Sequence, residues 1–94
     1  MMGELRNPDE TPEHRLKRLR LRSWRRGIKE MDLILGAYAD ARLAELDAGT
    51  LDRYEALLDE NDQDLYKWVS GGAPHPATHA EMLSEIAEFH GIES

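Results

Sequence analysis

The sequence contains no cysteine among its 94 residues. Disulfide bonds, thiolate metal sites and a cysteine nucleophile are therefore excluded, and folding does not require an oxidising compartment. No apolar run approaches the roughly 18 residues of a membrane span. Met1–Glu13 has neither the basic start nor the apolar middle of a signal peptide. These absences predict a cytoplasmic protein with no membrane partner.

Strict alternation of apolar and polar residues, the pattern of a half-buried strand, is missing as well. Apolar residues recur at three-to-four spacing between turn residues, which predicts about five short helices. The expected fold class is all-α, in the form of a small bundle. Residues 1–10 are polar and lack periodicity, so we expect a disordered leader there and a single helical domain over residues 11–94.

The first helix is expected to begin at Thr11-Pro12-Glu13, with Thr11 as its N-cap and the proline at the first helical position. It should run towards Arg26, with Gly27 as a left-handed C-terminal cap. Its predicted inward side chains are Leu21, Trp24 and Ile28.

The second helix is expected to open with Glu30 and Asp32 and to end near Asp47–Gly49. Thr50 is the expected N-cap of a third helix. The predicted inward side chains of these two helices are Met31, Ile34, Leu35, Tyr38, Leu46, Leu51, Tyr54, Leu57 and Leu58.

A short fourth helix is expected to start at a cap formed by Asn61 or Asp62. Thr78 and Glu81 have the spacing of a capping box for the last helix, and Gly91 follows that helix. The predicted inward side chains are Leu65, Trp68, Val69, Met82, Leu83, Ile86 and Phe89.

The charge of the chain changes sign at the pentapeptide Arg26-Gly27-Ile28-Lys29-Glu30. From Arg15 to Lys29 there are eight basic residues and no acidic one, whereas from Glu30 onward three basic residues face fifteen acidic ones. A glycine between a basic helix end and a carboxylate exposes backbone beside both charges. Gly27 and Glu30 also have a purely structural interpretation, as a helix cap and a first-turn acid. The pattern favours docking over catalysis.

The basic segment would also suit a phosphate-binding helix in a nucleic-acid-binding or regulatory module. Its members are Arg15, Lys17, Arg18, Arg20, Arg22, Arg25, Arg26 and Lys29. The net charge of −7, the lack of an aromatic platform and the lack of a nucleic-acid-binding motif disfavour this hypothesis. Nucleic-acid binding is therefore the alternative hypothesis, and a helical adaptor for an unrelated partner stays open as a third.

Residues for metal binding or catalysis are not patterned. His75 and His79 have the i, i+4 spacing of helical metal ligands, but Pro76 and the predicted cap at Thr78 place His75 outside the last helix. No serine lies in a nucleophile motif. We expect no metal site, no catalytic residue and no enzymatic activity.

The charge-reversal pentapeptide belongs to a longer pattern. The segment Trp24-Arg25-Arg26-Gly27-Ile28-Lys29-Glu30-Met31-Asp32 is followed about thirty residues later by Asp62-Gln63-Asp64-Leu65-Tyr66-Lys67-Trp68. This RGxxE motif, with its later Asp-x-Asp-Leu-aromatic-x-Trp segment, resembles the SdhE-type flavinylation factors of succinate dehydrogenase. The resemblance covers residues 16–90.

The resemblance implies a non-enzymatic assembly factor. Such a factor binds the flavoprotein subunit of succinate dehydrogenase and promotes covalent attachment of FAD, through its 8α methyl carbon, to a histidine of that subunit. It implies that FAD is attached to the partner and that the chain itself holds no tightly bound cofactor. Whether fumarate reductase is also a client is left open.

The resemblance also implies a partner-binding site. Its central residues are Arg26, Gly27 and Glu30. The flanking residues are Arg25, Ile28, Lys29 and Asp32, and the later segment adds Asp62, Asp64 and Trp68.

Overall fold

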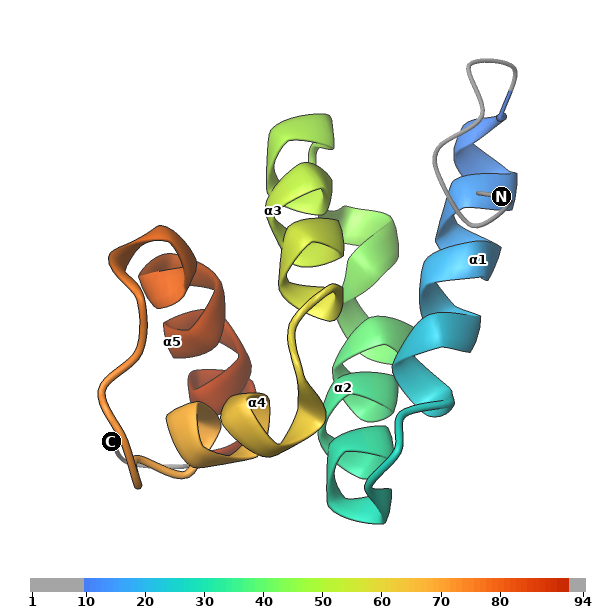
Figure 1. The fold of residues 1–94 in the computed structure, drawn as a ribbon. Helices are drawn as coiled ribbons and strands as arrows, with labels where there is room; N and C mark the ends of the chain where they lie inside the picture. The colour runs from blue at the N-terminus through green and yellow to red at the C-terminus, as the bar shows by residue number, and fades with distance from the viewer. Residues whose placement is uncertain (1–9, 92–94) are drawn as a thin grey trace.

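A computed structural model describes residues 10–91 of the chain (Figure 1). Over these residues it contains helices and no strand, which confirms the all-α prediction. The elements are α1 (Pro12–Trp24), α2 (Lys29–Arg42), η1 (Leu43–Glu45), α3 (Ala48–Leu58), α4 (Asp62–Val69), η2 (Ala77–His79) and α5 (Ala80–His90). Residues 1–9 of the predicted leader lie outside the described part. Between residues 10 and 91, no helix has the length and apolar character needed to cross a bilayer.

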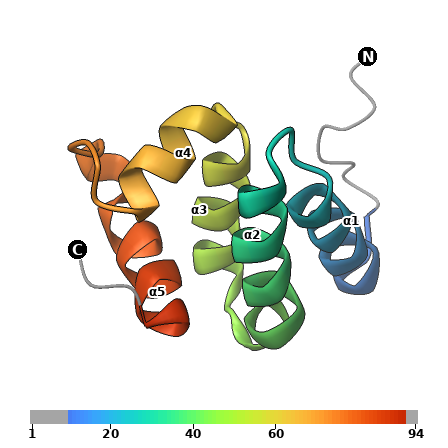
Figure 2. The ribbon, with the colours of Figure 1, turned by 90° about the horizontal axis from the view of Figure 1, so that it is seen from below.

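The helices form a row in the order α1, α2, α3 and α5, and α4 crosses one end of it (Figures 1 and 2). Helix α2 packs against α1 on one side and against α4 and α5 on the other. The connection between α1 and α2 reaches the same end of the row as α4 (Figure 1). This arrangement brings the charge-reversal pentapeptide next to the start of α4.

The core between the helices is largely apolar and contains a buried polar link through Ser23 and Tyr54. Its largest fully buried side chains are Tyr38, Tyr54, Leu19, Met31, Leu35, Leu43, Leu57, Leu58, Leu65 and Ile86. The Oγ of Ser23 donates to the carbonyl of Leu19 and lies 2.6 Å from the Oη of Tyr54, which reaches the carbonyl of Leu35 at 3.3 Å. Burial raises the pKa of Tyr54. This link joins α1, α3 and α2, and it pairs the hydroxyls of Ser23 and Tyr54.

The start of α1 agrees with the prediction, but its inward face does not. Thr11 caps the helix, and its Oγ1 accepts from the N–H of His14 at 3.1 Å. Leu21 and Trp24 are exposed by 52% and 38%, whereas Leu19 and Ser23 are fully buried. The prediction favoured Leu21 because Leu21, Trp24 and Ile28 fall on one side of the chain at helical spacing. The structure buries Ser23 because its hydroxyl is satisfied inside the core.

The predicted caps in the second half of the chain were partly wrong. Asp47, not Thr50, caps α3, and its Oδ1 accepts from the N–H of Thr50 at 2.8 Å. Asn61 caps α4 as predicted. The capping box at Thr78 does not form, because Thr78 lies inside η2. The carboxylate of Glu81 instead lies 3.3 Å from Arg53.

Four arginines of the basic segment are paired with acidic residues from elsewhere in the fold. Three of them follow one face of α1 at helical spacing, and the fourth follows the helix. The ion pairs are Arg15 with Asp52 and Glu55, Arg18 with Glu10 and Glu55, Arg22 with Asp59, and Arg26 with Asp62. This face of α1 is therefore occupied by carboxylates of Glu10, of α3 and of its C-cap residue Asp59, which weakens the nucleic-acid hypothesis.

The Glu55 cluster predicts a pH dependence of stability. Burial acts to raise the pKa of Glu55, but hydrogen bonds and charge from Arg18 and Arg15 outweigh it, so the pKa lies below its usual value of 4.5. A lowered folded-state pKa contributes stability that is present above the unfolded value and is lost as the pH falls through the folded one. The free energy of unfolding, measured by urea denaturation, should therefore fall below about pH 4.5, and less steeply in Glu55→Gln. Equal slopes would contradict this assignment.

Candidate docking surface

The guanidinium of Arg26 is directed into the protein. Its Nε donates to Oδ1 of Asp62 at 2.6 Å, Nη1 donates to the carbonyl of Leu58 at 2.8 Å, and Nη2 donates to the carbonyl of Glu60 at 2.9 Å. The Arg26 side chain is only 9% exposed. Because Leu58 ends α3 and Asp62 begins α4, these bonds tie the α1–α2 connection to the α3–α4 connection. Arg26 thus has a positioning role.

The backbone of the pentapeptide is held by two carboxylates. The N–H of Arg26 donates to Oδ1 of Asp32 at 2.5 Å, and the N–H of Gly27 donates to Oδ2 of Asp62. A Cβ at position 27 would lie 3.2 Å from that same oxygen. Gly27 does not have a positive φ, so the predicted left-handed cap is wrong. Glycine here permits the close approach of Asp62, and Arg25 is the C-cap residue of α1.

The remaining charges of the pentapeptide region face solvent. Arg25, Gly27, Lys29 and Glu30 are all exposed, and we call them the motif surface. Within residues 10–91, no ion pair with another side chain is formed by Arg25, Lys29 or Glu30. Glu30 lies in the first turn of α2, where the helix dipole favours its negative charge. The motif surface therefore offers a partner an unpaired carboxylate and two unpaired cations.

An apolar groove adjoins the motif surface. It lies between α2 and α4, has a volume of about 430 Å³, and is called here the α2–α4 groove. Its lining residues are Glu30, Leu33, Ile34, Tyr66, Val69 and Ser70. Leu33 and Tyr66 are exposed by 53% and 42%. Glu30 belongs to both the motif surface and the groove.

The other predicted site residues have different surroundings. Ile28 is half-buried at the N-cap of α2, and Trp68 is half-buried against the core, with its ring centroid 6.1 Å from that of His79. Asp64 is exposed in the first turn of α4. Asp32 and Asp62 hold the pentapeptide as described above. The structure therefore brings Arg26, Gly27, Asp32 and Asp62 together and leaves Asp64 apart from them.

Sequence reasoning did not include Leu33 or Tyr66 in the site. Tyr66 occupies the aromatic position of the Asp-x-Asp-Leu-aromatic-x-Trp pattern, which is a signal that could have identified it. Leu33 lies three residues after Glu30, the spacing at which two helical side chains share a face. An exposed leucine at that spacing from the motif was the second available signal.

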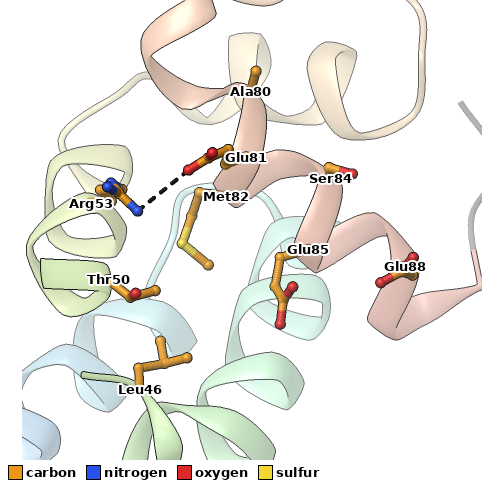
Figure 3. Close-up of a pocket in the computed structure, with 9 residues that line it drawn as sticks. All are labelled: Leu46, Thr50, Arg53, Ala80, Glu81, Met82, Ser84, Glu85 and Glu88. Carbon is orange, nitrogen blue, oxygen red and sulfur yellow. Dashed lines mark ion pairs between the residues drawn. The ribbon is translucent and has the colours of Figure 1, made fainter.

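A second hollow, of about 610 Å³, lies between α3 and α5 (Figure 3). Leu46 and Met82 point into it, and Glu85 and Glu88 come from α5. The ion pair between Arg53 and Glu81 crosses from one helix to the other (Figure 3). None of its lining residues belongs to the motif surface, so this hollow is separate from the candidate site.

No group of three metal-ligating side chains is found in the described part of the chain. His79 is buried, and its Nε2 lies 2.8 Å from the carboxylate of Glu60. That contact joins η2 to the α3–α4 connection, and the carbonyl of Glu60 accepts the bond from Arg26.

Comparison with known proteins identifies related sequences. A family model described as Sdh5, flavinator of succinate dehydrogenase, matches residues 17–90. A protein of Aspergillus terreus named succinate dehydrogenase assembly factor 2, mitochondrial, is 45% identical over 64 residues, which are 68% of this chain and 22% of that protein. The protein of the same name from Schizosaccharomyces pombe is 34% identical over 82 residues, which are 85% of this chain and 59% of that protein. The chain thus spans about a fifth to three fifths of the length of these relatives.

The prediction of a cytoplasmic location is contradicted by these names. The relatives from Aspergillus terreus, Penicillium rubens, Candida glabrata and Schizosaccharomyces pombe are all named as mitochondrial proteins. The prediction was based on the lack of cysteine and of long apolar runs. The lack of cysteine removes the need for disulfide formation. Neither feature distinguishes one compartment from another.

The Arg26 contacts predict a selective loss of stability. Arg26→Ala and Asp62→Ala should each lower the free energy of unfolding by about 2 kcal/mol, because each leaves a part-buried charge without its partner. The double variant should lose less than the sum of the two. Arg25→Ala is the matched control, since Arg25 is exposed, and it should cost under about 0.5 kcal/mol. Urea denaturation followed by circular dichroism measures all four, and additive losses would contradict a direct pair.

Proposed function

Because the chain belongs to the family of succinate dehydrogenase flavinators, we propose that it binds the flavoprotein subunit of succinate dehydrogenase and promotes covalent attachment of FAD to that subunit. The names of its relatives as succinate dehydrogenase assembly factors support this proposal. The RGxxE motif and the later Asp-x-Asp-Leu-aromatic-x-Trp segment both lie within the matched residues 17–90. The proposed role is that of an assembly factor and not of an enzyme.

The observation that carries the proposal is the environment of Glu30. Its carboxylate is exposed, has no ion-pair partner in the described chain and borders an apolar groove. In the proposed complex, Glu30 accepts hydrogen bonds from the flavoprotein, and Gly27, Lys29 and Arg25 contact it around Glu30. Such charge-assisted hydrogen bonds are the stronger kind across an interface.

Arg26, Asp32 and Asp62 have an indirect role in this proposal. Their bonds hold the backbone at Arg26 and Gly27 and so fix the start of α2, where Glu30 lies. A preformed surface loses less conformational entropy on binding than a mobile one. These three residues are therefore positioning residues, and Glu30 is the contact residue.

A docking protein can accelerate its partner's reaction by binding the reactive conformation more tightly than the others. About 1.4 kcal/mol of such preference gives a tenfold acceleration. In this account the flavin and the flavoprotein supply the reacting atoms. The chain supplies binding energy and needs no tightly bound FAD of its own.

Glu30→Gln should slow the covalent attachment of FAD about tenfold, because it removes a charge-assisted interaction with the partner. The measurement is in-gel flavin fluorescence of the denatured flavoprotein subunit, followed over time after co-expression. The lanes compare no factor, the wild-type chain and the variant. A rate that is the same with and without the wild-type chain would contradict the proposed function.

Glu13→Gln is the matched control for this experiment. Glu13 is also an exposed acid in the first turn of a helix, so both substitutions remove the same kind of helix-dipole interaction. Glu13 lies at the start of α1, outside the motif surface and the α2–α4 groove. Its substitution should leave the rate of FAD attachment unchanged. An equal loss in the two variants would place the effect of Glu30 in helix stability.

A further inference from the structure

Within residues 10–91, the large apolar side chains that are exposed lie on three of the helices. The large apolar residues that face solvent in the described part are Leu21 and Trp24 on α1, Leu33 on α2 and Tyr66 on α4. Helices α3 and α5 present none of comparable size and exposure among the described residues. Exposed apolar residues that lie close together mark interaction surfaces, whereas scattered ones carry no such meaning.

Three of these residues are neighbours across α2. Leu33 and Tyr66 line the same groove. On the other flank, the indole of Trp24 lies on Gly36, where an added Cβ would be 2.3 Å from the ring. Gly36 is about one helical turn after Leu33, so Trp24 lies against α2 one turn from Leu33. The indole N–H donates to Asp40 at 3.2 Å, which leaves the exposed part of Trp24 without an unpaired polar group.

One polar side chain of the groove is paired within the protein. The hydroxyl of Ser70 donates to the carbonyl of Tyr66 at 2.7 Å. Leu33, Ile34 and Val69 have apolar side chains. Glu30 is the only charged lining residue, and it has no ion-pair partner in the described chain. An occupant of the α2–α4 groove therefore needs an apolar side chain and a neighbouring positive charge.

We propose that the α2–α4 groove receives an apolar side chain from a segment of the flavoprotein subunit that also places a lysine or arginine against Glu30. This inference rests on the proposed function and adds the chemistry of the partner segment. The groove is continuous with the motif surface through Glu30, so one segment can contact both. Leu33 and Tyr66 become buried contacts in the complex, and Trp24 extends the covered surface on the α1 side.

Leu33→Gln tests the apolar contact, and Leu21→Gln is its matched control. The two leucines are exposed by 53% and 52%, both lie in helices, and only Leu33 lines the groove. Glutamine keeps helix propensity, so neither variant should lose helical circular dichroism. Titration calorimetry with the purified flavoprotein subunit should show about tenfold or more weaker binding for Leu33→Gln, and under about twofold for Leu21→Gln.

Tyr66→Gln, on the opposite wall of the groove, should weaken binding to a similar extent. Glu30→Gln should reduce the dependence of the affinity on salt, because the proposed lysine or arginine loses its partner.

Equal affinities for wild type, Leu33→Gln and Tyr66→Gln would overturn the inference while leaving the proposed function intact. An unchanged salt dependence in Glu30→Gln would overturn its charged part. Absence of binding by the wild-type chain would overturn the proposed function and this inference together.

Discussion

The rest of the candidate site depends on the hydrogen bonds that the carboxylate of Asp62 accepts. One of its oxygens accepts from the Arg26 guanidinium and the other from the backbone of Gly27. The same guanidinium satisfies carbonyls at the end of α3 and in the α3–α4 connection. Residues separated by about thirty positions are thereby held together, and the first turn of α2 is fixed beside α4. Both walls of the α2–α4 groove come from these two helices.

The separation of charge along the sequence has a structural explanation in the fold. The basic residues of α1 and the acidic residues of α3 are far apart in the chain, but Arg15, Arg18 and Arg22 lie against their carboxylates. An ion pair between part-buried side chains is less screened by salt than an exposed one. The basic segment thus contributes largely to the internal packing of the domain. Arg25, Lys29 and Glu30 are among the exposed charges left for a partner.

Much of the fold could be predicted from the sequence, because helix periodicity and caps are local signals. Thr11, Asn61 and Gly91 end or begin helices as expected. Some caps were wrong for local reasons, as at Asp47, and two further errors arose where a tertiary contact decided the outcome. Leu21 was expected in the core but is exposed. Ser23 is buried instead, because Tyr54 supplies a hydrogen-bond partner for its hydroxyl. Gly27 was expected to have a left-handed conformation, but its role depends on Asp62, which no local pattern around Gly27 indicates.

The partner-binding role of the candidate site residues stays a prediction, and the structure shows how each of them is placed. Glu30 and Gly27 are exposed as a docking surface requires, whereas Arg26 was expected to face a partner and is held internally. The sequence held signals for Tyr66 and Leu33 separately, but the groove between them arises from the approach of α2 to α4, which no local pattern indicates. Leu33 and Tyr66 have exposed positions that a periodicity argument assigns to solvent.

The most direct test of this account is photo-crosslinking with an unnatural benzophenone amino acid placed at position 33 or position 84. Leu33 lines the α2–α4 groove and Ser84 lines the separate hollow between α3 and α5. The account predicts a crosslink to the flavoprotein subunit from position 33 and none from position 84. Crosslinking from position 84 with none from position 33 would contradict it and would place the docking surface on α5.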